Sequence, residues 1–152
     1  MMSKGFTLVE ILIVVIILGI LAAIVIPQFT EASNDARESA LASDLQTLRS
    51  QLELYKVQHL ERYPNIKEDG TADATVANFV SRLTGKTDQY GKIDATGVFG
   101  PYLQKFPTNA FANNAVVFGV VDPAPVVAGN GWYFNTDLGK ISANDTAPHA
   151  GL

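Results

Sequence analysis

An apolar run near its start constrains this chain more than any other feature. Residues 6–29 carry a single charged side chain, that of Glu10. A helix rises by about 1.5 Å per residue, so a helix over this run is about 36 Å long and can span a hydrocarbon core of about 30 Å. The sequence therefore predicts one membrane-spanning helix over 6–29, followed by a water-soluble remainder.

Charge around the apolar run predicts how it crosses a membrane. Lys4 precedes the run, and no other Lys or Arg occurs before Arg37. Positive residues favour the cytoplasmic side, so we expect a cytoplasmic N-terminus and an outward-facing remainder. A secretory signal has a shorter apolar stretch followed by its cleavage site, whereas Gly5 comes before this run. Cleavage at Gly5 would leave the helix on the mature protein.

Helical periodicity continues beyond the apolar run. Residues 28–61 contain no Gly or Pro, and large side chains recur in steps of four and three. This stripe consists of Leu41, Leu45, Leu48, Leu52, Tyr55 and His59. Such spacing places all of them on one face of a helix. We expect one long helix from Phe6 to about Leu60, with a membrane half over 6–29 and an amphipathic half over 30–61.

Gly19 and Pro27 mark the expected weak point of this helix. Pro27 cannot donate a hydrogen bond to the Ala23 carbonyl, and an interior proline costs about 3 kcal/mol in a helix exposed to water. The helix should bend or unwind between Gly19 and Pro27 when it is pulled or repacked. A tolerated transmembrane kink is the alternative interpretation.

Residues 62–152 are expected to form one globular head. Its first element is a short amphipathic helix over 75–84, which Gly85 ends. Three strands are predicted over 115–121, 132–135 and 140–143, joined as a small antiparallel meander. The expected buried side of the sheet comprises Val116, Phe118, Val120, Trp132, Phe134 and Ile141. The predicted fold class is therefore α+β, with the sheet packed on the amphipathic half of the long helix.

The run from Gly97 to Phe111 concentrates aromatic side chains around two prolines. If exposed, it would form an adhesive or subunit-contact loop. We favour the alternative, in which its large side chains fill the gap between helix and sheet. These side chains are Phe99, Tyr102, Leu103 and Phe106.

Several functional classes find no support in the sequence. The chain has no cysteine, so neither a disulfide nor a thiolate metal site is available. Its net charge of −4 does not suit a nucleic-acid backbone. His59 and His149 are far apart in sequence, which argues against a zinc site and favours a partly buried structural His59. We find no serine-protease triad, convincing carboxylate pair or phosphate-binding glycine loop, and we do not expect an enzyme.

The hexapeptide GFTLVE at residues 5–10 and the apolar helix after it resemble the processing signal and anchor of the type IV pilin and type II secretion pseudopilin superfamily. The resemblance is specific over residues 4–27 and looser as far as Leu60. It implies a leader over 1–5 that prepilin peptidase removes by cutting after Gly5, and an N-methylated Phe6. Glu10 would serve assembly by an inner-membrane platform with its ATPase, and Pro27 matches the helix-breaking proline of the family.

The position of Glu10 gives it a physical task. A carboxylate four residues into the anchor is costly in a membrane unless it finds a partner. Glu10 lies about 6 Å along the helix from Phe6, where cleavage would create a positive amine. The amine of a staggered neighbouring subunit would attract this carboxylate by about 4 kcal/mol, before desolvation, at about 4 Å and an effective dielectric constant near 20. In the alternative interpretation, Glu10 only reaches the membrane interface.

These features predict a structural subunit that forms a helical homopolymer. It would leave the lipid bilayer of the inner membrane for an extracellular or periplasmic filament. Because the chain lacks the Asp-Pro-Trp-Gly type signature of the major pseudopilin, we favour a type IV pilus-like filament. The alternative is a pseudopilin of a type II secretion system. A monomeric single-span protein with a ligand-binding head is less favoured and predicts that Gly5 is not cut.

Resemblance to the major pseudopilins also makes calcium a candidate ligand. The candidate residues are Asp122, Asp137 and Asp145, which lie in or after the strand connections. Acidic residues in turns usually serve as turn formers, and we favour that role here. Asn144 lies in an N-glycosylation pattern that often arises by chance, and we assign it no role.

Overall fold

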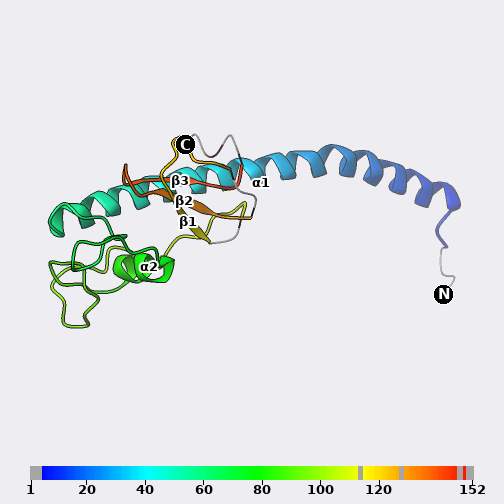
Figure 1. Cartoon of the computed structure of the whole chain (residues 1–152). Helices are drawn as coiled ribbons and strands as arrows, with labels where there is room; N and C mark the ends of the chain where they lie inside the picture. The colour runs from blue at the N-terminus through cyan, green and yellow to red at the C-terminus, as the bar shows by residue number, and fades with distance from the viewer. Residues whose placement is uncertain (1–4, 113–114, 127–128, 147–148, 150–152) are drawn as a thin grey trace. The chain divides into compact units, whose positions relative to one another are not determined.

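The computed structural model describes residues 5–112, 115–126, 129–146 and 149. The chain divides into two units, Met1–Glu38 and Ser39–Leu152. Helix α1 (Leu8–Gln58) contributes to both units, and α2 (Val76–Thr84) lies in the second. The second unit also holds the strands β1 (Val116–Gly119), β2 (Trp132–Asn135) and β3 (Lys140–Ala143) (Figure 1). Residues 1–4, most of the expected leader, lie outside the described residues.

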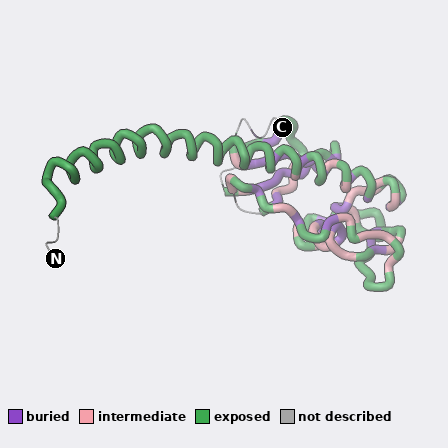
Figure 2. The backbone as a smooth tube through the Cα atoms, turned by 180° about the vertical axis from the view of Figure 1, so that it is seen from behind, coloured by how far each residue is buried: buried purple, intermediate pink, exposed green. Residues whose placement is uncertain are grey.

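The first unit is the exposed half of α1. Every described residue from Gly5 to Glu38 is exposed, as the unbroken green tube in Figure 2 shows. Helix α1 contains a stretch that is long and apolar enough to cross a membrane. Its bounds confirm the predicted long helix to within two residues at either end. Because an apolar surface of this size is unfavourable in water, a membrane or other chains must cover it.

The second unit is built around the apolar stripe of α1. The predicted stripe is confirmed, because all of its members are at most 1% exposed: Leu41, Leu45, Leu48, Leu52, Tyr55 and His59. The leucines and Tyr55 share a core with α2 residues Phe79 and Leu83 and with residues of the sheet. This half of the helix thus gains its stability from packing against the head.

The three strands form a mixed sheet in the order β1-β2-β3. Strands β2 and β3 are antiparallel, with Phe134 opposite Ile141, whereas β1 runs parallel to β2, with Val116 opposite Trp132. The predicted α+β fold of a long helix and a small sheet is confirmed, but the antiparallel order is wrong for the first strand pair. The connection over 120–131 has about a dozen residues, enough to carry the chain back to the starting end of β1.

The predicted buried side of the sheet is confirmed except at Val120, which follows the first strand. Val116, Trp132, Phe134 and Ile141 are buried, and Phe118 is partly buried. Val120 is 60% exposed, so its predicted burial is wrong. Strand β1 already ends at Gly119, and the Tyr133 hydroxyl bonds to both the N–H and the carbonyl of Val121. Val120 therefore lies beyond the end of β1, and its side chain is not part of the buried face of the sheet.

The aromatic run after Gly97 fills a gap, as we favoured. Leu103 and Phe106 are each 8% exposed and belong to the core. Tyr102 packs against this core, and its hydroxyl donates to Gln58 Oε1 at 2.6 Å. Phe99 is half-buried, and its ring lies edge-on to His59. The run therefore seals the end of the head around the last turns of α1.

A candidate assembly site at the start of the long helix

The expected cleavage point lies outside the helix. Gly5, Phe6 and Thr7 precede α1, which begins at Leu8, and all three are exposed. The peptide bond between Gly5 and Phe6 is therefore not part of the hydrogen-bonded helix. A peptidase could reach it without unwinding a helical turn.

Thr7 and Glu10 form a reciprocal pair of hydrogen bonds at the start of α1. The Glu10 N–H donates to Thr7 Oγ1 at 3.3 Å, and the Thr7 N–H donates to Glu10 Oε2 at a longer 3.5 Å. The Thr7 carbonyl accepts a hydrogen bond from the Ile11 N–H at 3.3 Å. This arrangement is a capping box, in which Thr7 is the N-cap and Glu10 closes the box three residues later. Sequence reasoning missed Thr7, although the pattern Thr-x-x-Glu before an apolar run indicates such a cap.

Glu10 stands among exposed apolar side chains. Phe6, Leu8, Ile11 and Leu12 surround it along the chain, and more than half of the surface of each is exposed. Residues 6–29 thus carry one carboxylate, near the N-terminal end of a continuous apolar surface. In a membrane or a helix bundle, such a carboxylate would be the main polar feature to be satisfied.

Helix α1 passes through both predicted weak points without a break. Gly19 and Pro27 are exposed, and both lie inside the helix. The Thr30 hydroxyl donates to the Ile26 carbonyl at 3.2 Å in the turn that contains Pro27. Bending or unwinding under load thus stays a prediction.

His59 has the structural role that we favoured. Its Nδ1 lies 2.8 Å from the Tyr55 carbonyl, which can only accept, so Nδ1 carries the proton. Its Nε2 then accepts from the Thr87 hydroxyl at 2.9 Å. The ring stacks on Tyr55 with 3.8 Å between centroids, and burial lowers the pKa of His59 below 6.5. The residue is therefore a neutral, satisfied part of the core.

The calcium candidates do not come together. Asp122 pairs with Lys140 at 3.5 Å on the surface, and Asp137 is exposed. Asp145 is held by the Nδ1 of His149 at 2.6 Å and by the Asn109 amide. Over the part of the chain that the structure describes, no group of three or more His, Asp or Glu side chains could hold a metal ion. The three carboxylates thus do not belong to one acidic cluster, and calcium binding through loop oxygens stays a prediction.

Asn144 is fully buried. An N-linked glycan needs an exposed asparagine, so the glycosylation pattern at this position has no structural support.

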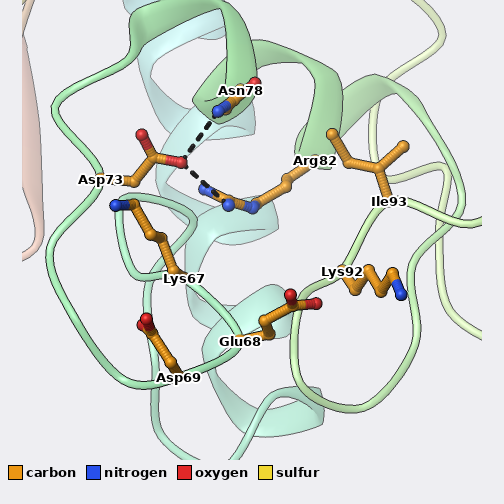
Figure 3. Close-up of a pocket in the computed structure, with 8 residues that line it drawn as sticks. All are labelled: Lys67, Glu68, Asp69, Asp73, Asn78, Arg82, Lys92 and Ile93. Carbon is orange, nitrogen blue, oxygen red and sulfur yellow. Dashed lines mark hydrogen bonds and ion pairs between the residues drawn. The ribbon is translucent and has the colours of Figure 1, made fainter.

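A charged pocket on the head is lined by side chains that hold neighbouring loops together. The pocket has a volume of about 340 Å³, and its lining includes Asp73, Asn78 and Arg82 (Figure 3). Arg82 Nη2 lies 2.9 Å from Asp73 Oδ2, and both side chains are less than 10% exposed. The guanidinium also donates to the carbonyls of Pro64 and Gly91. Because these partners come from loops on both sides of α2, Arg82 joins the helix to each of them.

Comparison with known proteins identifies the family of the chain. Residues 1–26 match the model of the prokaryotic N-terminal methylation motif. The type II secretion system core protein G of Pseudomonas aeruginosa is 39% identical over 111 residues, which cover 73% of this chain and 70% of that protein. The chain belongs to the type IV pilin and type II secretion pseudopilin superfamily. The expected resemblance is thereby confirmed, and it extends beyond the anchor into the head.

Other relatives carry the same name. The core protein G of Dickeya chrysanthemi is 40% identical over 66 residues, which span 43% of this chain and 42% of that protein. The core protein G of Escherichia coli is 26% identical over 115 residues, covering 76% and 71%. No solved structure matches the chain. None of these relatives is named as an enzyme, and their names support the pseudopilin alternative better than the pilus subunit that we favoured.

Proposed function

We propose that this chain is a pseudopilin, a structural subunit that polymerises into the filament of a type II secretion system. The observation that carries this proposal is the match to core protein G of Pseudomonas aeruginosa, which covers 73% of the chain. A match of the anchor alone would be common to pilins and pseudopilins. A match that also includes part of the head favours the pseudopilin.

The exposed half of α1 gives this function a physical basis. Leaving a bilayer for water costs about 25 cal/mol per Å² of apolar surface. The described residues from Gly5 to Glu38 are all exposed, and residues 6–29 among them are almost entirely apolar. Extraction becomes feasible when copies of the helix cover one another in a head-to-tail array, which is the open form of heterologous assembly. The same apolar surface then serves the membrane-bound precursor and the filament.

Processing supplies the charge that Glu10 needs. Cleavage after Gly5 by prepilin peptidase leaves a positive amine on Phe6, and N-methylation keeps that charge. In a staggered array, the amine of one subunit pairs with the Glu10 carboxylate of its neighbour and sets their register. The attraction of about 4 kcal/mol is partly offset by desolvation, so the pair contributes more to register than to net affinity.

The proposed partners follow from this route. The precursor lies in the inner membrane with a cytoplasmic N-terminus, where prepilin peptidase acts on it. An assembly platform and its ATPase then move it into a periplasmic filament made of copies of this chain.

Mass spectrometry of the native protein tests the processing step. We expect a chain that begins at Phe6 and carries one methyl group on its amine. A Gly5→Leu variant, in which a large side chain replaces the glycine before the cut, should stay uncleaved and serves as the control. A native chain that still begins at Met1 or Met2 would reject the proposal.

Deletion of the gene tests the secretion role. Loss of exoprotein release, restored by the unchanged chain but not by Gly5→Leu, is the expected result. Surface fibres that disappear while exoprotein release continues would instead identify a type IV pilus subunit.

A further inference from the structure

A row of large apolar side chains stays exposed on the head half of α1. Leu54 and Val57 lie one turn apart near the end of the helix, Leu60 follows it, and these three are between 43% and 70% exposed. The buried stripe of α1 faces the core that it shares with α2, so this outer row (Leu54, Val57 and Leu60) points away from that core. Single exposed apolar residues are ordinary, but three within two turns form a patch that favours a protein partner.

The surroundings of the outer row are acidic. Glu53 precedes the row, Glu61 follows it, and both are exposed. Lys56 lies 3.7 Å from Glu61, so two carboxylates and one ammonium leave this part of the surface with a net charge of −1. A membrane surface rich in anionic lipid would repel that charge, which makes a membrane an unsuitable partner. A partner with an apolar surface and a positive edge would fit the row.

A pocket beside the other helix of the head has these properties. This α2 pocket has a volume of about 360 Å³, and it is lined by Val80, Thr84, Gln104, Lys105 and Phe106. Val80 and Phe106 belong to the apolar core or pack against it, and they give the pocket apolar walls. Lys105 is exposed, and among the described residues that line the pocket it is the one that carries a charge.

We propose that the outer row of one chain docks into the α2 pocket of a second copy of this chain, with Glu61 beside Lys105. Both complementary surfaces belong to the same chain, so a second copy satisfies each of them. An apolar centre with charges at its edge is the usual anatomy of a protein interface. The inference rests on the proposed function and adds a contact between heads to the contact between the apolar helices.

The positions of the two surfaces allow a filament rather than a closed dimer. Figure 1 shows α1 along one side of the head and α2 along the other, and the outer row does not line the α2 pocket. A contact between two different surfaces is heterologous. Each copy can therefore bind one neighbour through its row and another through its pocket, and the array stays open at both ends.

Introduced cysteines test this contact directly, because the chain has none of its own. The full-length chain carries Val57→Cys in the row and Gln104→Cys at the pocket, and it is produced in cells with their own assembly machinery. Its filaments are then oxidised. A disulfide needs the two β-carbons within about 4.5 Å, so the double variant should give a ladder of dimers, trimers and longer products.

The single variants show whether the contact is heterologous. Each should stay monomeric, because its cysteine faces a position that has none, and a mixture of the two should give dimers and nothing longer. Leu138→Cys combined with Gln104→Cys is the matched control, because Leu138 is also more than half exposed but lies in the turn between β2 and β3. This control should give no ladder.

Charge reversal provides a second measurement. Lys105→Glu would place like charges together, and it should lower the fraction of subunit that sediments with sheared filaments about fivefold. Adding Glu61→Lys to the same chain should restore assembly. Both positions are exposed, so both variants should keep the urea midpoint of the unchanged head.

The inference is wrong if filaments of the double-cysteine variant contain no ladder, or if the Leu138→Cys control gives the same ladder. Dimers of Val57→Cys alone would show that the row packs against the row of its neighbour, and failure of Glu61→Lys to rescue Lys105→Glu would also overturn the docking. These results leave the proposed function intact, because the filaments are still present. If the unchanged chain is neither cleaved nor found in filaments, the proposed function fails, and this contact fails with it.

Discussion

Replacing Asp73 with Asn should strongly destabilise the head. The Asp73 side chain is 3% exposed, and its Oδ2 lies 2.9 Å from Arg82 Nη2. Its carboxylate also accepts hydrogen bonds from the Thr75 N–H and the Asn78 amide, each at 3.0 Å. Asn keeps the size of the side chain and one acceptor oxygen but removes the charge. The buried Arg82 guanidinium then loses its counter-ion.

The size of the effect follows from the environment of this carboxyl. Burial raises the pKa of Asp73, but hydrogen bonds from Asn78, Thr75 and Arg82 outweigh burial and lower the pKa from 3.8 to about 2. One pKa unit corresponds to about 1.4 kcal/mol, so ionisation of Asp73 stabilises the fold by about 2 kcal/mol. Removing one partner of a buried ion pair costs about 3–5 kcal/mol. Because Arg82 keeps two carbonyl partners, we expect a loss of about 3 kcal/mol.

Urea unfolding at pH 7 in detergent measures this loss. Trp132 is the only tryptophan and is fully buried, so its fluorescence reports on the head. With a slope of about 1.5 kcal/mol per M, the midpoint should fall by about 2 M. Asp69→Asn is the matched control, since Asp69 is an exposed residue of the same loop. A midpoint for Asp73→Asn no lower than that of Asp69→Asn would refute the reasoning.

Acid provides an independent check on the same residue. The folded pKa of Asp73 is depressed, so its contribution to the free energy of unfolding is present above about pH 3.8 and is lost as the pH falls through about 2. The unchanged protein should therefore lose about 2 kcal/mol more than Asp73→Asn between these pH values. Equal acid dependence of the two proteins would assign the stabilisation to another group.

Two further predictions concern the head. Burial lowers the pKa of His59, so as the pH falls the unfolded chain binds a proton before the folded chain does. The free energy of unfolding should therefore decrease as the pH drops below about 6.5. Urea unfolding at pH 7 and pH 5 should show a smaller decrease for His59→Phe than for the unchanged chain. Gly139→Ala should cost about 1–3 kcal/mol in the same assay. Gly139 has a φ of +66°, and an added Cβ would collide with the Tyr63 ring. Leu138→Ala, at an exposed position of the same turn, is the control; an equal effect of both substitutions would contradict this reason.

The parts of the fold that could be predicted depend on local periodicity. The stripe from Leu41 to His59 follows helical spacing, and an element with one apolar face must bury it against something. The strands after Gly131 were predictable for a similar reason, because the tight turn over 136–139 fixes the pairing of β2 and β3. In both cases the information lies within a few residues of the element that it specifies.

The parts that could not be predicted depend on contacts between distant residues or on unusual backbone. The direction of β1 depends on how a connection of about a dozen residues crosses the head, and no local pattern determines that path. Helix α1 ends at Gln58, close to the predicted end, and is followed by Leu60 and Glu61 with left-handed φ values of 56° and 60°. Left-handed residues are usually glycines, so the sequence contains no signal for this backbone conformation.

The functional and buried charged residues also divide into those that the sequence predicts and those that only the structure reveals. The carboxylate of Glu10 was recognisable because it is the one charge in an apolar run. The capping box of Thr7 and Glu10 has a short and frequent sequence pattern, so it could be recognised only once the start of α1 was known to lie there. The Asp73 and Arg82 pair was not predicted, because the two residues meet only after a loop and α2 have folded.

The two halves of α1 explain why assembly and folding can be altered separately. From Leu41 onward the helix contributes core side chains to the head, whereas the residues from Gly5 to Glu38 are exposed and add nothing to that core. Substitutions at Glu10 should therefore change filament formation and leave the urea midpoint of the head unchanged. Asp73→Asn should do the reverse, lowering the midpoint while the cut after Gly5 still occurs. A variant that loses filaments with an unchanged midpoint has lost an assembly contact, and this distinction allows mutational data on this chain to be assigned to assembly or to folding.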